Sequence, residues 1–121
     1  MTKTVLTVDD SKAIRDMVVF TLQPLGYNVV GAGDGSEGLQ RFRAEPVNLV
    51  ITDLNMPKMN GIEFIKELRK DPRGAGIPVI MLTTETKQEM KDAGKAAGAT
   101  GWINKPFDAN TLVAVTRKLA G

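Results

Sequence analysis

Four of the short apolar runs in this sequence lead into side chains that could do chemistry. Asp9 and Asp10 follow the first run, and Asp53 follows the third. Thr83 follows the fourth run and Lys105 the fifth, whereas the second run leads into GAGDGSEG and offers nothing comparable. Three carboxylates, a hydroxyl and an ammonium group suit a hard cation and the charged oxygens of a phosphoryl group.

Each of these residues also has an ordinary structural explanation. Asp10 or Ser11 could cap a helix, Asp53 could open a turn, and Thr83 could cap the helix that follows it. Lys105 alone could be surface charge. The set as a whole is harder to explain in this way, because helix caps do not require one lysine to face three acids.

Acids that are crowded at one place must be neutralised. Two carboxylates about 5 Å apart repel each other by about 3 kcal/mol at an effective dielectric constant of about 20, so either one of them takes up a proton or a cation binds. An all-oxygen site with few protein ligands suits Mg²⁺, and Lys105 adds a second positive charge. A carboxylate can itself attack phosphorus, and a rigid strand tip would hold Asp53 in place for that reaction.

The spacing of the apolar residues alternates between strand-like and helix-like along the chain, which predicts an α/β fold with a parallel sheet covered by helices on both faces. The carboxyl ends of parallel strands form the edge at which ligands bind, and all of the polar residues above lie there. Strands are predicted at residues 4–8, 27–32, 47–52, 77–82 and 101–104. Helices are predicted between Ser11 and Gly26, at 36–44, from Ile62 to the DPRG segment, at 86–97 and at 109–119.

The composition indicates one ordinary globular domain that covers residues 1–121. Hydrophobic residues make up 42% of the chain and charged residues 25%, and no run reaches the roughly 18 apolar residues of a membrane span. The first residues, MTKTVLTVDD, lack the features of a signal peptide, and the chain ends with the fifth predicted helix. We therefore expect a cytoplasmic, single-domain monomer without membrane insertion.

The absence of two residue types excludes several kinds of site. Without cysteine there are no disulfides, thiolate metal sites or thiol nucleophiles, and without histidine there is no serine–histidine or cysteine–histidine catalysis. The net charge of +2 and the pI near 9.0 could suggest nucleic acid. The basic residues are scattered from Lys3 to Lys118 with few aromatic residues among them, so we expect no nucleic-acid partner.

The segments VDDS, DLNMPKMNG, MLTT and NKPF, in this order and spacing, resemble the receiver domain of bacterial two-component response regulators, most closely the stand-alone CheY-like type. The resemblance covers essentially the whole chain. It implies a flavodoxin-like (βα)5 doubly wound sheet with strand order 2-1-3-4-5. It also implies a signalling switch that catalyses only its own phosphorylation and dephosphorylation, and whose donor is a sensor histidine kinase or a phosphotransfer protein.

By this resemblance, Asp53 is the residue that accepts the phosphoryl group. The Thr83 hydroxyl and Lys105 would each bind one phosphoryl oxygen, and the peptide bond between Lys105 and Pro106 is usually cis in the family. Mg²⁺ would be held at the same place by oxygen ligands from two strand ends, namely Asp9, Asp10, Asp53 and the backbone carbonyl of Asn55.

Three further positions match residues that act on signalling in this family. Asn55 and Glu85 match the chemotaxis-type pattern of the positions that set how long phosphorylation lasts, which implies self-hydrolysis; the alternative is that both are ordinary polar loop residues. Trp102 takes the place of an aromatic ring that swings inward as the threonine hydroxyl moves. We expect its fluorescence to report the switch, with full burial of the larger indole left open.

The fourth predicted helix is the weakest by propensity, because Gly94 and Gly98 each cost about 1 kcal/mol relative to alanine if they are helical. We therefore expect it to be the moving part. Lys87, Lys91 and Lys95 recur at intervals of four and form one stripe, which is either an ordinary solvated face or a docking surface for an acidic partner. The downstream partner that the resemblance implies is the flagellar motor switch or another effector protein.

Two other classes of protein share parts of this pattern. Aspartyl-phosphate phosphatases of the haloacid dehalogenase group also use Asp, Lys and Thr or Ser, but their nucleophile lies in a D-x-D pattern, whereas Asp9 and Asp10 are adjacent. Flavodoxin-like nucleotide binders carry a Gly/Ser/Thr-rich phosphate loop after the first strand, and the acidic VDDSK segment would repel a phosphate there unless a metal intervened. Repeated turnover of a phosphate ester would favour the first class, and a flavin spectrum the second.

Overall fold

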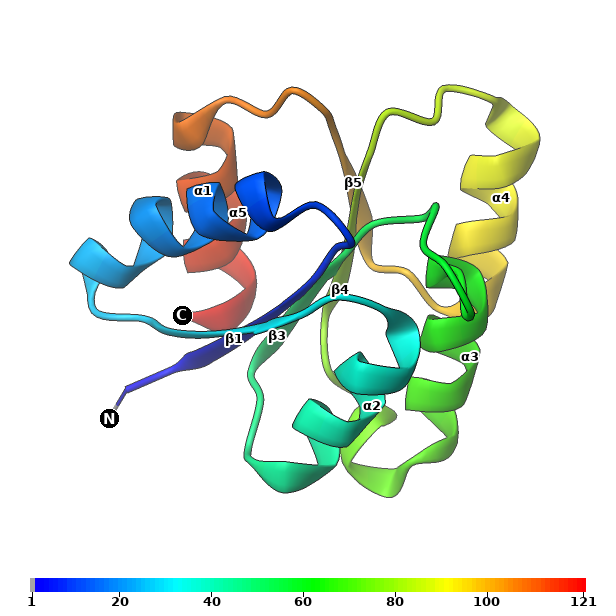
Figure 1. Ribbon diagram of the computed structural model, residues 1–121, viewed down its shortest axis with the longest axis horizontal. Coiled ribbons are helices and arrows are strands. Elements are labelled where there is room, and N and C mark those ends of the chain that lie inside the picture. The colour runs from blue at the N-terminus through cyan, green and yellow to red at the C-terminus, as the bar shows by residue number, and fades with distance from the viewer. Residues whose placement is uncertain (1) are drawn as a thin grey trace.

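The computed structural model describes residues 2–121; Met1, which the predicted domain includes, lies outside the described residues. Five parallel strands form one sheet in the order β2-β1-β3-β4-β5 (Figure 1). The α/β class and the strand order are therefore confirmed. The strands are β1 (Thr4–Val8), β2 (Asn28–Ala32), β3 (Leu49–Thr52), β4 (Val79–Thr83) and β5 (Gly101–Asn104). The helices are α1 (Lys12–Leu22), α2 (Gly35–Ala44), α3 (Gly61–Lys70), α4 (Gln88–Ala97) and α5 (Ala109–Ala120).

The sheet separates two apolar cores, with α1 and α5 on one face and α2, α3 and α4 on the other (Figure 1). Val50 and Met81 belong to the core that includes Phe64 of α3. Ile51, the neighbour of Val50 in β3, belongs instead to the core that includes Leu112 of α5. Since each such buried side chain contributes about 2 kcal/mol of transfer free energy, the central strands are anchored from both sides.

The first helix differs from its prediction at its C-terminal end. The helix α1 stops at Leu22, and a 3-10 turn (η1, Gln23–Leu25) follows it, with Pro24 in the first turn of that element. Met17 and Leu25 fit the helical spacing of the apolar residues, yet 45% and 42% of their surfaces are exposed. Helical spacing therefore does not by itself assign these two residues to the core, and Leu25 lies beyond the end of the α-helix.

The fourth helix is held to the rest of the protein by little buried surface. It begins two residues later than predicted, after Lys87, which has no side-chain capping bond. Gly94 is its one buried residue. Gly98 is not helical but ends the helix with φ of 117°, a conformation that glycine adopts readily. The predicted penalty therefore applies to Gly94 alone, and the helix remains weakly anchored.

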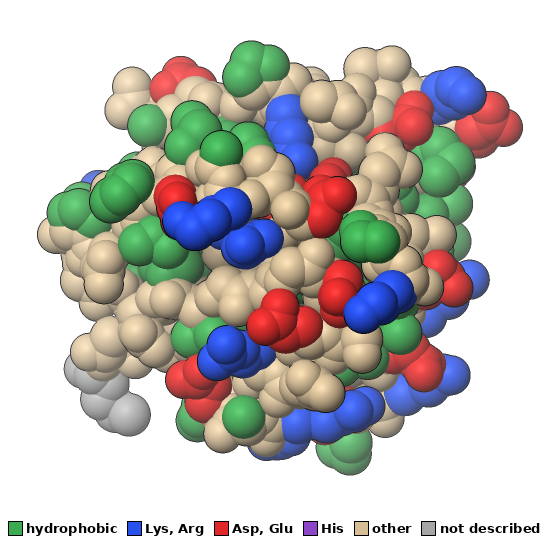
Figure 2. Space-filling view, in the orientation of Figure 1, with side chains coloured by type: hydrophobic (Ala, Val, Ile, Leu, Met, Phe, Trp, Pro, Cys, Tyr) green, Lys and Arg blue, Asp and Glu red, His purple; other side chains and the backbone are tan. Residues whose placement is uncertain are grey.

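Two observations bear on the helices and on the charged side chains of the face in view. Among the helices within residues 2–121, none has the length and apolar character needed to cross a bilayer. Figure 2 shows acidic and basic side chains interspersed over the face in view rather than gathered into a patch of one sign. On this face, that distribution is typical of solvated surface charge.

Candidate functional site

The candidate site lies at the carboxyl ends of β1, β3, β4 and β5, and the sheet ladder extends into it. The amide of Asp53 donates to the carbonyl of Val8 at 2.8 Å, and the amide of Lys105 donates to the carbonyl of Thr83 at 2.9 Å. The amide of Asp9 donates to the last residue of β2 at 3.0 Å. These residues follow their strands directly, so the sheet sets the positions of their backbones.

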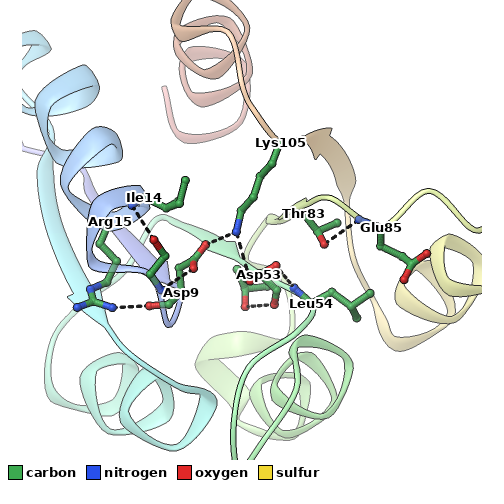
Figure 3. A network of polar contacts seen from close by, with 10 residues as sticks. Asp9, Ile14, Arg15, Asp53, Leu54, Thr83, Glu85 and Lys105 are labelled. Atoms are coloured by element: carbon green, nitrogen blue, oxygen red, sulfur yellow. Dashed lines mark hydrogen bonds and ion pairs between the residues drawn. The ribbon is translucent and has the colours of Figure 1, made fainter.

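Three carboxylates meet at this edge. Asp9, Asp10 and Asp53 each present one oxygen, and the three oxygens lie within 4.8 Å of one another. Asp9 and Asp53 are buried, with 2% and 7% of their surfaces exposed, whereas Asp10 is exposed. The Lys105 Nζ lies 2.8 Å from Asp9 Oδ2 and 3.3 Å from Asp53 Oδ2, between the two acids (Figure 3).

Backbone amides hold the other oxygen of each buried carboxylate. The amide of Ser11 donates to Asp9 Oδ1 at 2.9 Å, and the amide of Leu54 donates to Asp53 Oδ1 at 2.8 Å. Each carboxylate thus has one oxygen on the backbone and one facing Lys105. Two attachments per carboxylate restrict its rotation, which is what a nucleophile held for attack requires.

The charges of the site are coupled. Burial raises the pKa of the Asp9 carboxyl above its ordinary value, and Asp53 adds to this shift, while bonds from Lys105 and from the Ser11 amide oppose it. Burial alone would lower the pKa of Lys105, but the bond to Asp9 and the charges of Asp53 and Asp9 outweigh burial, so this pKa is raised. Lys105 therefore stays charged, whereas burial opposes the ionisation of Asp9.

The donor set fits a magnesium ion. Three carboxylates against the single ammonium of Lys105 leave two negative charges within this group, which a divalent cation would balance. Oxygen ligands are those that Mg²⁺ prefers, and the exposure of Asp10 opens the cluster to a cation that keeps part of its hydration shell. A bound Mg²⁺ would also favour ionised Asp9.

Thr83 is the last residue of β4 and is fully buried. The register of β3 with β4 places it one residue beyond the level of Asp53. Its Oγ1 accepts a hydrogen bond from the Glu85 amide at 3.2 Å and does not cap α4, so the capping alternative for Thr83 is wrong. Because the hydroxyl accepts that bond, its hydrogen can be donated toward the site.

The helix cap after β1 belongs to Ser11, which accepts a hydrogen bond from the Ile14 amide at 3.3 Å. This ordinary explanation is confirmed for Ser11. Asp10 does not fill the N-cap position, and its carboxylate belongs to the acid cluster instead. The cap thus starts α1 directly after the two acids and helps to place them.

The other residues singled out from the sequence lie around this centre. Asn55 is exposed in the loop after β3. The Glu85 carboxylate accepts hydrogen bonds from the amides of Thr86 and Lys87 at 3.1 and 2.9 Å, so it also orders the loop before α4. The peptide bond between Lys105 and Pro106 is cis.

Trp102 of β5 lies beside α4. Its ring packs against the core that includes Met81, and its Nε1 is buried without a hydrogen-bond partner among residues 2–121. The Lys91 Nζ lies 5.7 Å from the centre of the ring, a cation–π arrangement. Hollows of about 260 Å³ on the α4 side and about 410 Å³ on the α5 side both border the indole, so the ring has space next to it.

The site depends on a glycine that none of the sequence patterns above singled out. A β-carbon on Gly61 would overlap the carbonyl oxygen of Asp53, and the Gly61 amide donates to the Leu54 carbonyl at 2.8 Å. The loop after Asp53 therefore closes tightly enough only with glycine there. Asn60 and Glu63 form a capping box at the start of α3; the N-G-x-E sequence was the available signal.

Comparison with known proteins agrees with this geometry. Residues 5–117 match the family model for the response regulator receiver domain. A structure of chemotaxis protein CheY4 from Vibrio cholerae is 45% identical, with 98% of this chain and 99% of that chain covered and a TM-score of 0.94. A CheY-like receiver domain protein from Methanospirillum hungatei JF-1 is 32% identical over 98% of this chain and 94% of its own, with a TM-score of 0.91. A receiver protein from Pseudomonas putida is 27% identical over 98% of each chain, with a TM-score of 0.91.

With its acid cluster and lysine at the carboxyl ends of a 2-1-3-4-5 sheet, the chain belongs to the response regulator receiver domain family of two-component signalling.

Proposed function

We propose that this protein is a phosphorylation-dependent switch in which Asp53 accepts a phosphoryl group from a histidine kinase or a phosphotransfer protein with the help of Mg²⁺. The observation that carries the proposal is the position of Lys105. Its ammonium lies within 3.3 Å of Asp53 and 2.8 Å of Asp9, beside a third carboxylate. A buried nucleophile, a fixed cation and a metal-binding oxygen cluster together meet the needs of phosphoryl transfer.

The transfer exchanges one bond for another. A carboxylate oxygen of Asp53 forms a bond to phosphorus as the bond between phosphorus and the donor imidazole nitrogen breaks. The imidazole keeps the electron pair of the broken bond and takes up a proton, and Asp53 becomes an acyl phosphate. The amide of Leu54 holds one carboxylate oxygen of Asp53 during this step, so that the other is presented to phosphorus.

Two side chains stabilise the transferred group in this proposal. Lys105 moves its bond from Asp53 to a phosphoryl oxygen and keeps its contact with Asp9. Thr83 donates its hydroxyl hydrogen to a second phosphoryl oxygen, which draws the end of β4 toward the site. Bound Mg²⁺, held by Asp9, Asp10, Asp53 and the backbone carbonyl of Asn55, would supply the charge that a third oxygen needs.

The signal ends when water attacks phosphorus and Asp53 is restored as a carboxylate. Asn55 and Glu85 are the proposed residues that set the rate of this step, since each lies two positions beyond a residue that contacts the phosphoryl group. Glu85 is bound to the amides of Thr86 and Lys87, so it can act on water only if the loop before α4 rearranges. Replacing it with alanine is expected to change the lifetime of the phosphorylated state.

The proposed output surface comprises α4, β5 and α5. Movement of Thr83 acts on the loop before α4 through the Glu85 amide, and Trp102 lies between that helix and the hollow beside α5. A downstream protein with acidic side chains would meet Lys91 and Lys95 next to the exposed part of the indole. Reversing the charge of Lys91 is expected to slow association with such a partner; an unchanged association rate would remove Lys91 from this surface.

The test of the phosphorylation proposal is intact-mass measurement after incubation with a small phosphodonor such as acetyl phosphate. The parent protein is expected to gain one phosphoryl group with Mg²⁺ present and none after the metal is removed by a chelator. Asp53→Asn is expected to gain none under either condition. Asp16→Asn, which removes a half-buried acid of α1 outside the acid cluster, is the matched control and is expected to behave like the parent.

The same experiment reports the switch. Beryllofluoride with Mg²⁺ imitates the phosphoryl group on an aspartate, and its addition is expected to change the intensity or wavelength of Trp102 fluorescence in the parent but not in Asp53→Asn. Modification of Asp53→Asn at position 53 would contradict the assigned acceptor. An unchanged emission spectrum in a phosphorylated parent would contradict the role given to Trp102.

We further propose that residues 1–121 form one receiver domain and that its pathway is chemotaxis, with the flagellar motor switch or a comparable effector as the target. The support is the 45% identity to a chemotaxis protein over nearly the whole of both chains. Restoration of chemotaxis in a strain that lacks its own single-domain chemotaxis regulator would test the pathway, with Asp53→Asn expected to fail.

A further inference from the structure

Arg15 lies on the other side of Asp9 from Lys105, and the mechanism above does not use it (Figure 3). Its Nη1 donates a hydrogen bond to the backbone carbonyl of Asp9 at 2.5 Å. Arg15 stands in the first half of α1, so this bond links the helix back to the turn that carries the two adjacent acids. A charged donor makes a stronger bond to a carbonyl than a neutral donor does.

The end of β2 leaves space for this side chain. A β-carbon on Gly31 would lie 3.4 Å from Arg15 Cδ, and one on Gly33 would lie 3.7 Å from Arg15 Nη1. The GAG segment, which carries no candidate functional side chain, therefore borders the path along which Arg15 reaches Asp9. Larger side chains at these two positions would compete with the arginine for the same space.

The bonded carbonyl belongs to the peptide that joins Asp9 to Asp10. A peptide unit is planar, and the Cα atoms of both residues lie in its plane. Fixing the Asp9 carbonyl thus fixes the direction in which Asp10 leaves the strand. Asp9 and Asp53 are buried and bonded to backbone amides, whereas Asp10 is exposed and depends more on the turn itself for its position.

We propose that Arg15 is a positioning residue for the Mg²⁺ site, which holds the peptide between the two acids so that Asp10 meets the cation together with Asp9 and Asp53. This inference rests on the proposed function, because it takes the acid cluster to be a Mg²⁺ site. Arg15 touches neither the metal nor the phosphoryl group in this role.

The sign of the effect on metal affinity tests the proposal. Arg15 carries a positive charge near a cation site, so its charge alone repels Mg²⁺. If charge were its main influence, removing it would tighten Mg²⁺ binding. If Arg15 holds the peptide in place, removing it weakens binding, because residues that orient metal ligands are typically worth 10-fold or more in affinity.

The experiment is calorimetric titration of the whole chain with Mg²⁺ alone. Arg15→Ala is expected to raise the dissociation constant about tenfold. The matched control is Lys12→Ala, which removes an equal charge from the same helix; Lys12 is 79% exposed and pairs with Asp16. We expect this control to bind Mg²⁺ as tightly as the parent or slightly more tightly.

Gly31→Val supplies a second test that keeps the charge of Arg15. Its branched side chain suits a strand but extends toward Arg15 Cδ, so it is expected to displace the arginine and weaken Mg²⁺ binding as well. If Arg15→Ala does not fold, the Mg²⁺ titration of Gly31→Val tests the proposal in its place. At saturating Mg²⁺ both variants are expected to be phosphorylated at the parent rate, because neither residue contacts the reacting groups.

Unfolding in urea with and without Mg²⁺ distinguishes an effect of Arg15 on metal affinity from a general effect on stability. The stability gained from the metal depends on its dissociation constant and not on the starting stability, so it is expected to shrink in Arg15→Ala. Mg²⁺ affinity equal to or tighter than that of the parent in both Arg15→Ala and Gly31→Val would overturn the inference and leave the proposed function intact. Failure of the parent to bind Mg²⁺ would overturn both.

Discussion

Two regions of the molecule leave different amounts of space for an added methyl group: the edge of the sheet at the carboxyl ends of its strands, called the rim below, and the contact between α4 and β5, called the seam. A β-carbon on Gly61 would overlap the carbonyl of Asp53, beside the candidate phosphoryl acceptor. A β-carbon on Gly94, the buried residue of α4, would lie 3.4 Å from the Trp102 ring, which is an ordinary contact distance. The backbone around the acids has no spare room, whereas the seam between α4 and β5 can accommodate a methyl group.

Under the proposed function, this difference separates chemistry from signalling within one small domain. Phosphoryl transfer requires charges held within a few tenths of an ångström, which a sheet anchored from both faces provides. A change that a partner can detect requires an element with little buried surface, which α4 is. The variants below alter one region or the other, from the largest expected effect to the smallest.

Lys105→Met removes the cation at the centre of the rim and leaves Asp9 and Asp53 facing each other. Removing one partner of a buried ion pair costs about 3 kcal/mol of unfolding free energy, and loss of a donor to the transition state slows transfer about 100-fold. Urea unfolding without metal and phosphorylation by acetyl phosphate measure the two effects. Added Mg²⁺ is expected to recover part of the stability. A stability equal to that of the parent would show that the rim does not depend on this charge.

The stability difference between the parent and Lys105→Met is expected to depend on pH. The folded-state pKa of Lys105 lies above its ordinary 10.5, so its contribution is fully present below pH 10.5 and is lost as the pH rises through the higher folded value. The raised pKa of Asp9 means that its proton stays bound above pH 3.8, so the repulsion between the acids disappears on acidification. The difference should therefore be largest between these limits and shrink on either side. A difference that stays constant on acidification would contradict the coupling.

Gly61→Ala tests the crowded side of the comparison. The added carbon forces the loop away from the Asp53 carbonyl, and overpacking of this kind costs about 2 kcal/mol. Weaker Mg²⁺ binding is expected as well, because the displaced loop carries Asn55. Gly76→Ala is the control, since a β-carbon there has nothing within 4 Å, and its stability is expected to change by less than about 1 kcal/mol. Equal unfolding midpoints for the two variants would show that the rim tolerates the extra carbon.

Gly94→Ala tests the permissive side. Replacing a glycine inside a helix with alanine stabilises it by about 1 kcal/mol, and the structure has room for the methyl group. Stability in urea is expected to rise, and phosphorylation of Asp53 to proceed at the parent rate. The fluorescence change of Trp102 on adding beryllofluoride is expected to be smaller, since the helix would be harder to move. A loss of stability would mean that the seam is as tight as the rim.

Lys91→Met is expected to have the smallest effect. It removes the ammonium over the Trp102 ring, a contact worth about 0.5 kcal/mol at an exposed site, and keeps an apolar chain of similar length. A small shift of Trp102 emission without a change in phosphorylation is the expected result. A large loss of stability would place α4 among the strongly anchored elements.

Sequence patterns were sufficient to predict much of the fold and the composition of the site. Apolar runs ending on polar side chains predicted that the three acids, Thr83 and Lys105 share one edge, because parallel strands align their carboxyl ends. The same reasoning failed where an apolar residue only happened to fit a period. Leu25 fits the spacing of α1 yet lies beyond its end, and Thr83 was also a candidate for a helix cap until its hydrogen bond was known.

The sequence by itself determined the alternation of strands and helices and the kinds of side chain at the strand ends, since both depend on residue type and local spacing. The tertiary structure alone decided that Lys105 lies between Asp9 and Asp53, that the Gly61 backbone meets the Asp53 carbonyl, and that Arg15 reaches the peptide between the two acids. Such contacts depend on the directions in which packed elements approach each other. Those directions result from the two cores on the faces of the sheet, and no local pattern of residues encodes them.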